Sequence, residues 1–337
     1  MYDLVRRALF TLSPETSHDF SLDGLSGLQR LGLLHLLPQP RVEARKTVFG
    51  IEFPNAVGLA AGLDKNADYL DALGQLGFGF IEVGTVTPKP QPGNPKPRLF
   101  RLPQSEAIIN RMGFNNKGVD YLVERVRKAK YPGVIGINIG KNKVTPEEDA
   151  LADYLYCLDR VYPHAHYVVV NLSSPNTPGL RNLQFGDALK GLLAGLKSRQ
   201  ETLSEEWGYR PILIKIAPDM TTDEIEQVAQ LFNEYRVDGV VATNTTLSRE
   251  RVEGQEHAEE AGGLSGRPLF EDSTRVLEAF RARLNDDIPL VGVGGITFGQ
   301  DALTKIQAGA DLVQLYTGFI YKGPRLVRDC VEKLAEL

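Results

Sequence analysis

A pattern that recurs along the chain is clearest in Tyr167-Val168-Val169-Val170-Asn171-Leu172-Ser173-Ser174-Pro175-Asn176. The first half of this stretch is apolar and β-branched, which favours a short buried strand. The second half carries hydroxyl and amide side chains around a proline, which is typical of a loop. The stretch therefore predicts a buried strand whose carboxyl end presents polar groups.

Seven further apolar runs of similar length occur along the chain, with helical patterns between most of them. They are Ala56–Ala60, Phe78–Gly84, Val134–Ile139, Pro211–Ile216, Gly239–Thr243, Leu290–Gly294 and Asp311–Leu315. Together with Tyr167–Leu172 they make eight strand units, which indicates an α/β protein built as a closed parallel (β/α)8 barrel. An open, doubly wound sheet is the structural alternative.

Polar or glycine residues follow nearly every run, and they favour the barrel over the open sheet. A TIM barrel gathers the carboxyl ends of all its strands on one face, whereas an open sheet does not. These residues are Gly62-Leu63-Asp64-Lys65, Thr85, Gly140-Lys141, Lys215, Thr243-Asn244-Thr245, Gly294-Gly295 and Tyr316-Thr317-Gly318. We therefore predict one catalytic mouth lined by all eight strand ends.

The segment from Thr87 to Pro132 does not look like a plain crossover helix. Its first part is rich in proline and glycine, an ordered run follows at Leu99–Leu102, and a helical pattern covers Val119 to Lys130. Long loops inside a compact domain are more often functional than idle. We expect this segment to be an insertion over the mouth.

Residues 1–40 stand apart from the barrel, which we expect to occupy residues 41–337. The pattern predicts two amphipathic helices, from Leu4 to Leu12 and from Phe20 to Leu31, punctuated by Ser13-Pro14-Glu15 and by Pro38-Gln39-Pro40. One interpretation is a cap on the bottom of the barrel. The other is an element on the membrane surface, with Arg6, Arg7 and Arg30 facing lipid headgroups.

Composition narrows the classes of function. The 337 residues carry a formal net charge of -5 and no dense run of lysine and arginine, so we expect no nucleic-acid partner. Cys157 and Cys330 lie far apart without a histidine cluster, so we expect two buried thiols, no metal site and a reducing, cytosol-facing location. No stretch approaches the roughly 20 apolar residues of a membrane-spanning helix. Chemistry on a small molecule is the default.

Three sets of residues suggest what that chemistry is. Glycines at Gly292-Val293-Gly294-Gly295 and around Tyr316-Thr317-Gly318 are typical of a phosphate cradle, although they also suit tight turns. Lys215 ends an apolar strand, where a buried ammonium serves either as a Schiff-base nucleophile or as a cation beside a cofactor ring. Several asparagines suit a planar, imide-like heterocycle, with Lys65 for its carboxylate.

The chain resembles the dihydroorotate dehydrogenase family in a series of motifs that run in order along nearly its whole length. The motifs are Gly58-Leu59-Ala60-Ala61-Gly62-Leu63-Asp64-Lys65, Gly84-Thr85-Val86-Thr87-Pro88, Asn110-Arg111-Met112-Gly113-Phe114-Asn115-Asn116, Asn138-Ile139-Gly140, Asn171-Leu172-Ser173-Ser174-Pro175-Asn176-Thr177, Lys215-Ile216-Ala217-Pro218-Asp219, Thr243-Asn244-Thr245-Thr246 and Gly262-Gly263-Leu264-Ser265-Gly266. The resemblance implies oxidation of dihydroorotate to orotate in pyrimidine biosynthesis, with FMN as cofactor.

The resemblance also implies which residues form the site. FMN is expected to contact Ala61, Gly62, Asp64, Lys65, Thr85, Asn138, Asn171, Lys215, Thr243, Gly266, Gly295, Tyr316 and Thr317. Thr317 stands where serine is frequent in relatives and keeps the hydroxyl. Dihydroorotate is expected to contact Lys65, Asn110, Arg111, Met112, Gly113, Phe114, Asn171, Asn176, Asn244 and Thr245. Ser174 matches the catalytic base, a position at which soluble members carry cysteine.

Ser174 and the N-terminal helices match the quinone-dependent class of the family. That class implies a membrane quinone as electron acceptor, peripheral lipid contact on the cytoplasmic side of the cell inner membrane, and a monomer. A dihydroorotate dehydrogenase with a soluble acceptor and another phosphate-binding barrel enzyme, such as an aldolase, are the alternatives. A non-enzymatic membrane-surface binding module is a third hypothesis, which rests only on residues 1–40.

Overall fold

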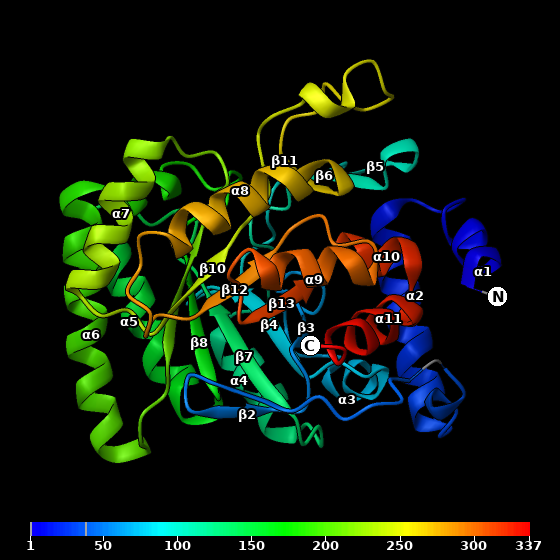
Figure 1. Ribbon diagram of the computed structural model, residues 1–337, viewed down its shortest axis with the longest axis horizontal. Coiled ribbons are helices and arrows are strands. Elements are labelled where there is room, and N and C mark those ends of the chain that lie inside the picture. Colours follow the sequence, from blue (N-terminus) through cyan, green and yellow to red (C-terminus); the bar gives the residue numbers. More distant parts are fainter. Residues whose placement is uncertain (1, 38) are drawn as a thin grey trace.

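Eight parallel strands close into a barrel in the computed structural model, which describes residues 2–37 and 39–337 (Figure 1). Around the barrel they follow chain order: β3 (Val57–Leu59), β4 (Phe80–Val86), β7 (Val134–Ile139), β8 (Tyr167–Asn171), β9 (Ile212–Ile216), β10 (Gly239–Ala242), β12 (Leu290–Val293) and β13 (Leu312–Leu315), which pairs with β3. Seven strands lie within predicted runs, and β4 begins in the run Phe78–Gly84 but continues to Val86. The predicted (β/α)8 barrel is confirmed, and the open sheet is wrong because it requires two unpaired edges.

Helices surround this barrel and cover the outer face of its strands. They are α3 (Leu70–Leu73), α4 (Val119–Lys128), α5 (Ala150–Val161), α6 (Gly186–Trp207), α7 (Thr222–Glu234), α8 (Phe270–Arg281), α9 (Gly299–Gln307), α10 (Thr317–Lys322) and α11 (Pro324–Leu334). In α7, for example, Thr221 and Glu224 form a capping box, and Ile225, Val228 and Phe232 bury one face at helical spacing. Short 3-10 turns lie at Leu34–Leu36, Gly74–Leu76, Pro103–Ser105, Tyr162–His164, Leu180–Gln184, Glu250–Val252 and Arg267–Leu269.

A hairpin formed by β1 (Lys46–Val48) and β2 (Ile51–Phe53) lies at the end of the barrel opposite the mouth (Figure 1). The Phe53 ring meets the Phe80 ring edge to face, with 5.2 Å between centroids, and the Phe80 and Tyr167 centroids are 6.3 Å apart. Aromatic packing therefore closes the base of the barrel.

Small residues in neighbouring strands make room for these rings. A Cβ at Gly58 would lie 2.2 Å from the Phe80 ring, and a Cβ at Gly136 would lie 2.2 Å from the Tyr167 ring. Glycine is therefore required at Gly58 and Gly136 by ring packing at the base of the barrel, and not by chemistry at the mouth. The hairpin itself was not predicted, because its two short strands pair only with each other.

A second, three-stranded sheet lies over the mouth, and we name it the mouth sheet. It consists of β5 (Leu99–Leu102), β6 (Ala107–Asn110) and β11 (Gly263–Gly266), all antiparallel (Figure 1). The first two belong to the predicted insertion, whose ordered run and helix are also found. The third comes from the distant loop after β10, and this pairing was not predicted.

Two helices precede the barrel, as predicted: α1 (Tyr2–Leu9) and α2 (Pro14–Arg30), the latter capped by Ser13. Helix α2 contacts α3 and β5, and α1 contacts α10, so the pair lies beside the mouth (Figure 1). The interpretation as a cap on the bottom of the barrel is therefore wrong. Met1 and Pro38, which belong to the predicted extension and its closing punctuation, lie outside the described residues.

Three polar contacts fix these helices to the mouth sheet. The Arg98 guanidinium pairs with Glu15 at 2.9 Å, and Arg101 donates to the backbone oxygens of Phe10 and Leu12, both at 3.1 Å. In the described part of the chain, no helix combines the length and the apolar character needed to cross a membrane.

The aromatic base yields a prediction about stability. Replacing Phe53 by alanine leaves a cavity beneath Phe80, and we expect the free energy of unfolding to fall by about 3–5 kcal/mol. Denaturant unfolding followed by tryptophan fluorescence and circular dichroism measures this loss. Phe20→Ala is the matched control, because that ring is 66% exposed. A Phe53 variant as stable as the Phe20 variant would show that the hairpin does not support the barrel.

Candidate active site

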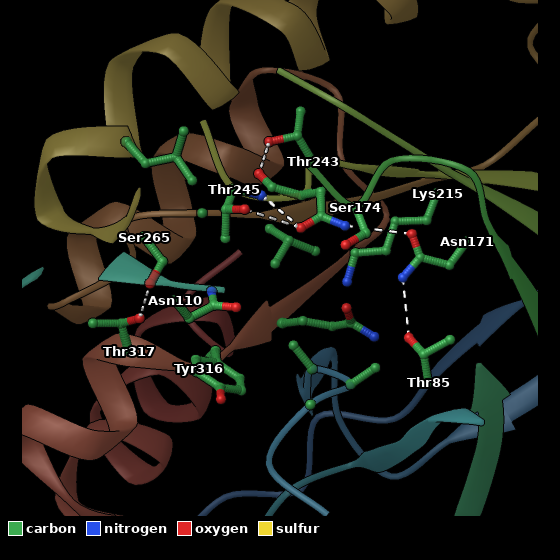
Figure 2. A pocket seen from close by; sticks show the side chains of 18 of the residues that line it. Thr85, Asn110, Asn171, Ser174, Lys215, Thr243, Thr245, Ser265, Tyr316 and Thr317 are labelled. Atoms are coloured by element: carbon green, nitrogen blue, oxygen red, sulfur yellow. Dashed lines mark hydrogen bonds between the residues drawn. The ribbon is translucent and has the colours of Figure 1, made fainter. Parts of the chain in front are cut away.

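A cavity lies between the carboxyl ends of the barrel strands and the mouth sheet. It holds about 1030 Å³ of empty space, including the part that opens to solvent. All but three of the predicted site residues line it: Ala61, Gly62, Lys65, Thr85, Asn110, Met112, Gly113, Phe114, Asn171, Ser174, Asn176, Lys215, Thr243, Asn244, Thr245, Gly266, Gly295, Tyr316 and Thr317. Figure 2 shows side chains from opposite walls facing a common centre.

Two of the remaining three residues hold the walls from outside the cavity. The Asp64 carboxylate accepts from the backbone N–H groups of Asp68 and Tyr69, at 2.9 and 2.8 Å, and so fixes the turn after β3. Burial raises the pKa of Asp64 to about 6. Arg111 pairs with Glu260 at 2.6 Å and so joins the insertion to the loop before β11.

The third residue, Asn138, lies inside the barrel in a chain of directed hydrogen bonds. Its amide nitrogen donates to the buried Glu82 carboxylate at 2.8 Å, and its oxygen accepts from Thr85 Oγ1 at 2.6 Å. Thr85 Oγ1 in turn accepts from Asn171 Nδ2 at 3.0 Å (Figure 2). Because a carboxylate only accepts, Glu82 sets the direction of every bond up to the cavity.

Glu82 has a second partner and was missed in the sequence. Gln314 Nε2, on β13, donates to its other oxygen at 2.5 Å, while Gln314 Oε1 is buried with no partner among the described residues. Glu82 and Gln314 each lie as a polar residue inside an otherwise apolar run of the sequence. The same pattern identified Lys215. Gln314 also lines the cavity.

Two lysines bring positive charge to the cavity without a carboxylate partner. Lys65 and Lys215 have no ion pair within 4 Å among residues 2–37 and 39–337. Burial, and then the charge of Arg98, lowers the pKa of Lys65 to about 8. Burial also lowers the pKa of Lys215, and the charge of Glu82 opposes this shift. Buried ammonium groups of this kind favour anionic ligands.

Ser174 lies in the loop after β8 and is almost fully buried. Its Oγ accepts from the Asn176 backbone N–H at 3.3 Å, which leaves its own proton unused by that contact. The loop is held by Arg181, which donates to the backbone oxygen of Ser173 at 3.0 Å and to the backbone oxygen of Thr245 at 2.9 Å. Arg181 was not predicted, because the atoms that it joins are backbone oxygens from separate loops.

The predicted asparagines form two hydrogen-bonded groups on the cavity wall. Asn176 Nδ2 donates to the Asn110 backbone oxygen at 3.1 Å. Asn244 Nδ2 donates to Ser173 Oγ at 2.9 Å, and Ser173 Oγ donates to Asn171 Oδ1 at 3.0 Å. The amides are therefore fixed in orientation before any ligand is bound, which suits recognition of a flat polar ring.

The opposite wall contains the predicted glycine turn. Gly294 and Gly295 have φ values of +120° and +75°, and a Cβ at Gly295 would lie 2.4 Å from Phe270 Cα. Only glycine fits this turn without strain. Beside it, the hydroxyls of Thr317 and Ser265 are 2.8 Å apart (Figure 2). Ser265 was missed as a site residue, although it lies inside the motif Gly262-Gly263-Leu264-Ser265-Gly266.

Comparison with known proteins agrees with this geometry. Residues 43–337 match the family described as Dihydroorotate dehydrogenase. Proteins named Dihydroorotate dehydrogenase (quinone) from Ectopseudomonas mendocina and Pseudomonas aeruginosa are 60% and 61% identical, and each alignment covers 100% of this chain and 99% of the relative. A crystal structure described as DHODH in complex with ferulenol from Eimeria tenella has a TM-score of 0.87 at 39% identity, covering 95% of this chain and 90% of that one.

The resemblance predicted from the sequence motifs is thereby confirmed. The match includes the residues on every wall of the cavity and extends through the N-terminal helices in the full-length relatives. Since both the sequence match and the barrel agree over nearly the whole length, the chain belongs to the dihydroorotate dehydrogenase family.

Proposed function

We propose that the protein oxidises dihydroorotate to orotate with bound FMN, passes the electrons to a membrane quinone and so serves pyrimidine biosynthesis. Full-length relatives named Dihydroorotate dehydrogenase (quinone) support the reaction and its acceptor. They do not favour an enzyme with a soluble acceptor, an aldolase or a non-enzymatic binding module. The observation that carries the proposal is one cavity that combines unpaired lysines with a fixed set of amides.

The cavity suits FMN, the flavin that we propose within a flavin-dependent family. In this proposal the cofactor is held by Ala61, Gly62, Lys65, Thr85, Asn171, Lys215, Thr243, Gly266, Gly295, Tyr316 and Thr317, with Asp64 and Asn138 supporting them from behind. The fit rests on the unpartnered Gln314 oxygen, on the buried Lys215 ammonium and on the glycine turn. When bound, FMN supplies a hydride acceptor.

Substrate recognition follows from the charges and amides of the same cavity. Lys65 binds the carboxylate of dihydroorotate, and Asn110, Asn171, Asn176, Asn244 and Thr245 bind its ring amides. The segment Arg111–Phe114 closes the pocket, with Met112, Gly113 and Phe114 on the cavity wall and Arg111 holding the segment through Glu260.

Ser174 Oγ would take the proton from ring carbon five while its own hydroxyl proton passes to water, and the hydride from ring carbon six would pass to the bound flavin. Its Oγ is buried and fixed by its loop, as a base that acts by position requires. Lys215 supplies a positive charge that favours the reduced cofactor. A Schiff-base role for Lys215 is not supported, because no carboxylate among the described residues forms an ion pair with its ammonium to tune its nucleophilicity.

The N-terminal helices, within the proposed extension of residues 1–40, form the quinone entrance on the membrane surface. Eight of the sixteen exposed large hydrophobic residues of the described chain lie between Leu4 and Leu36. Arg7 and Arg30 are exposed. Arg6 was also expected at the lipid surface, but it donates to the backbone oxygen of Tyr321 at 2.7 Å. We infer a monomer bound peripherally at the cytoplasmic face of the cell inner membrane.

Helix α2 also lies near Lys65, which lines the active-site cavity. The pKa of His18, on α2, is lowered to about 4, first by burial and then by the charge of Lys65. This proximity supports an electron acceptor that approaches the cofactor from the side of the extension.

Replacing the proposed base tests the chemical step. We expect Ser174→Ala to bind FMN but to be reduced by dihydroorotate about 10²–10⁴-fold more slowly, because only the base is lost. Ser174→Cys should retain part of the rate. Rapid mixing under anaerobic conditions follows the bleaching of the flavin. Unchanged bleaching in the alanine variant would exclude Ser174 as the base.

The lowered pKa of Lys65 predicts how substrate binding depends on pH. A carboxylate ligand binds the charged ammonium and raises its pKa, so affinity is highest below about pH 8 and falls as pH rises, by up to about tenfold per unit. Orotate binding, followed by the perturbation of the flavin spectrum between pH 6.5 and 9, measures this slope.

Uracil, which is orotate without the carboxylate, is the matched control ligand and should show no slope. Lys65→Met should bind orotate weakly at every pH. An orotate affinity that stays constant from pH 7 to 9 in the unmodified protein would exclude Lys65 as the carboxylate partner.

The complete reaction tests the function and the role of the extension together. We expect dihydroorotate to bleach the purified yellow protein anaerobically and a quinone to restore its colour. In a variant with Leu4, Phe20, Leu31 and Leu36 changed to serine, bleaching should persist. Vesicle binding and turnover with a long-tailed quinone should fall roughly tenfold or more, since each buried side chain contributes about 1.5–3 kcal/mol.

The matched control changes two exposed apolar residues of the barrel, Val144→Ser and Leu247→Ser. It should bind vesicles and reduce long-tailed quinone like the unmodified protein. Equal vesicle binding and equal turnover in both variants would contradict the proposed quinone entrance. An unmodified protein that dihydroorotate does not bleach would contradict the proposed function itself.

A further inference from the structure

A third buried lysine, Lys305, lies outside the cavity and takes no part in the reaction described above. It belongs to α9 and is fully buried. Its Nζ donates to Ser273 Oγ at 2.7 Å, lies 3.5 Å from the Phe270 oxygen and stands 5.0 Å from the centroid of the Phe270 ring. Among the described residues, no carboxylate lies within 4 Å of this ammonium.

The two residues that Lys305 contacts also form the back of the glycine turn. Ser273 Oγ lies 3.3 Å from the Gly294 oxygen, and a Cβ at Gly294 would come within 2.7 Å of the same Oγ. A Cβ at Gly295 would meet the Phe270 backbone. Ser273 and the turn Gly294–Gly295 therefore lie between the ammonium and the cavity, which both glycines line.

We propose that Lys305 is a positioning residue for the phosphate of the cofactor. Its positive charge attracts the negatively charged phosphate across the Gly294–Gly295 turn. The proposal rests on the proposed binding of FMN in this cavity. Lys305 does not touch the ligand; it supports the turn through Ser273 and makes the electrostatic potential behind the turn positive.

The physical reason is the free energy of burying an isolated ammonium group. A buried charge without a paired charge is strongly unfavourable, and the hydrogen bonds to one hydroxyl and one carbonyl compensate this only in part. An apolar side chain would join α8 to α9 at less cost. A phosphate dianion across the turn supplies the missing attraction, because Coulomb interactions fall off slowly where water is excluded.

The groups around Lys305 leave its charge largely uncompensated. Asp301 on α9 and Glu278 on α8 act from a distance to raise its pKa, but burial prevails and lowers the pKa to about 7. From α11, Cys330, Asp329 and Lys333 lie against α9; burial raises the pKa of the Cys330 thiol, and Asp329 and Lys333 lie beside Gly299 at the start of α9. The strands β12 and β13 contribute no ionisable side chain.

These charges fix the sign of a pH effect. Binding of a phosphate dianion stabilises charged Lys305, so the phosphate contribution to affinity is greatest below about pH 7 and decreases as pH rises and the free protein loses this proton. The second ionisation of a phosphate monoester, near pH 6, lies below this window and does not mask the effect.

Comparison of FMN with riboflavin isolates the phosphate. Both share the ring and therefore the influence of Lys65 and Lys215, so the ratio of their dissociation constants reports the phosphate alone. Flavin fluorescence during reconstitution of the full chain gives both constants between pH 6.5 and 9. For the unmodified protein we expect the preference for FMN to fall at least about tenfold from pH 7 to 9.

Lys305→Met should lower the preference for FMN roughly tenfold at pH 7 and remove its dependence on pH, with riboflavin binding unchanged. The matched control is Lys141→Met, since Lys141 is also buried and donates to the Thr145 oxygen at 2.7 Å but lies after β7. This control should keep both the preference and its slope.

Two results would overturn the inference. One is a preference for FMN that does not change with pH in the unmodified protein, a measurement that does not depend on the folding of any variant. The other is an equal loss of FMN and riboflavin affinity in Lys305→Met, which would indicate a purely structural anchor. An unmodified protein that binds FMN no better than riboflavin would instead contradict the proposed cofactor, and the inference with it.

Discussion

The structure depends on the burial of ammonium groups that have no carboxylate partners. Lys215 and Lys305 are buried and Lys65 is partly buried at the same end of the barrel, and taking an ion out of water costs several kcal/mol. This free energy is recovered only when an anion arrives. The barrel tolerates the arrangement because its large apolar core stabilises the fold independently of the mouth. Selectivity for anionic ligands therefore follows from desolvation before any specific contact is considered.

One buried carboxylate, Glu82, determines the direction of the hydrogen bonds inside the barrel. It accepts from Asn138 on the neighbouring strand β7 and from Gln314 on β13, and its charge opposes the loss of the Lys215 proton. The direction of donation then passes through Thr85 to Asn171, so that the Asn171 oxygen faces Ser173. An amide can rotate to exchange its donor and acceptor, but here one acceptor-only group at the base of the chain removes that freedom.

The sequence predicted the barrel and most of the cavity because both depend on local patterns. An apolar run followed by polar residues marks a strand and its mouth, and this pattern located Ser174 and Lys215 without knowledge of which strands pair. The pairing of β6 with β11 joins segments about 150 residues apart and leaves no local pattern. Arg181 and Lys305 were missed for the same reason, since their partners are backbone atoms or a hydroxyl on other elements.

The N-terminal helices and the barrel are separate in the sequence, but in the structure helix α2 lies close to the active-site cavity of the barrel. One face of α2 is fixed to the barrel through Glu15 and Arg98 and carries His18 to the neighbourhood of Lys65. The other face leaves Phe20 and Leu31 in solvent. The same helix therefore lies near a charged residue of the cavity and contributes to the exposed apolar surface. Detaching these helices would change the electrostatics of Lys65, because Glu15 and Asp19 act on its pKa, and would remove this apolar surface at the same time.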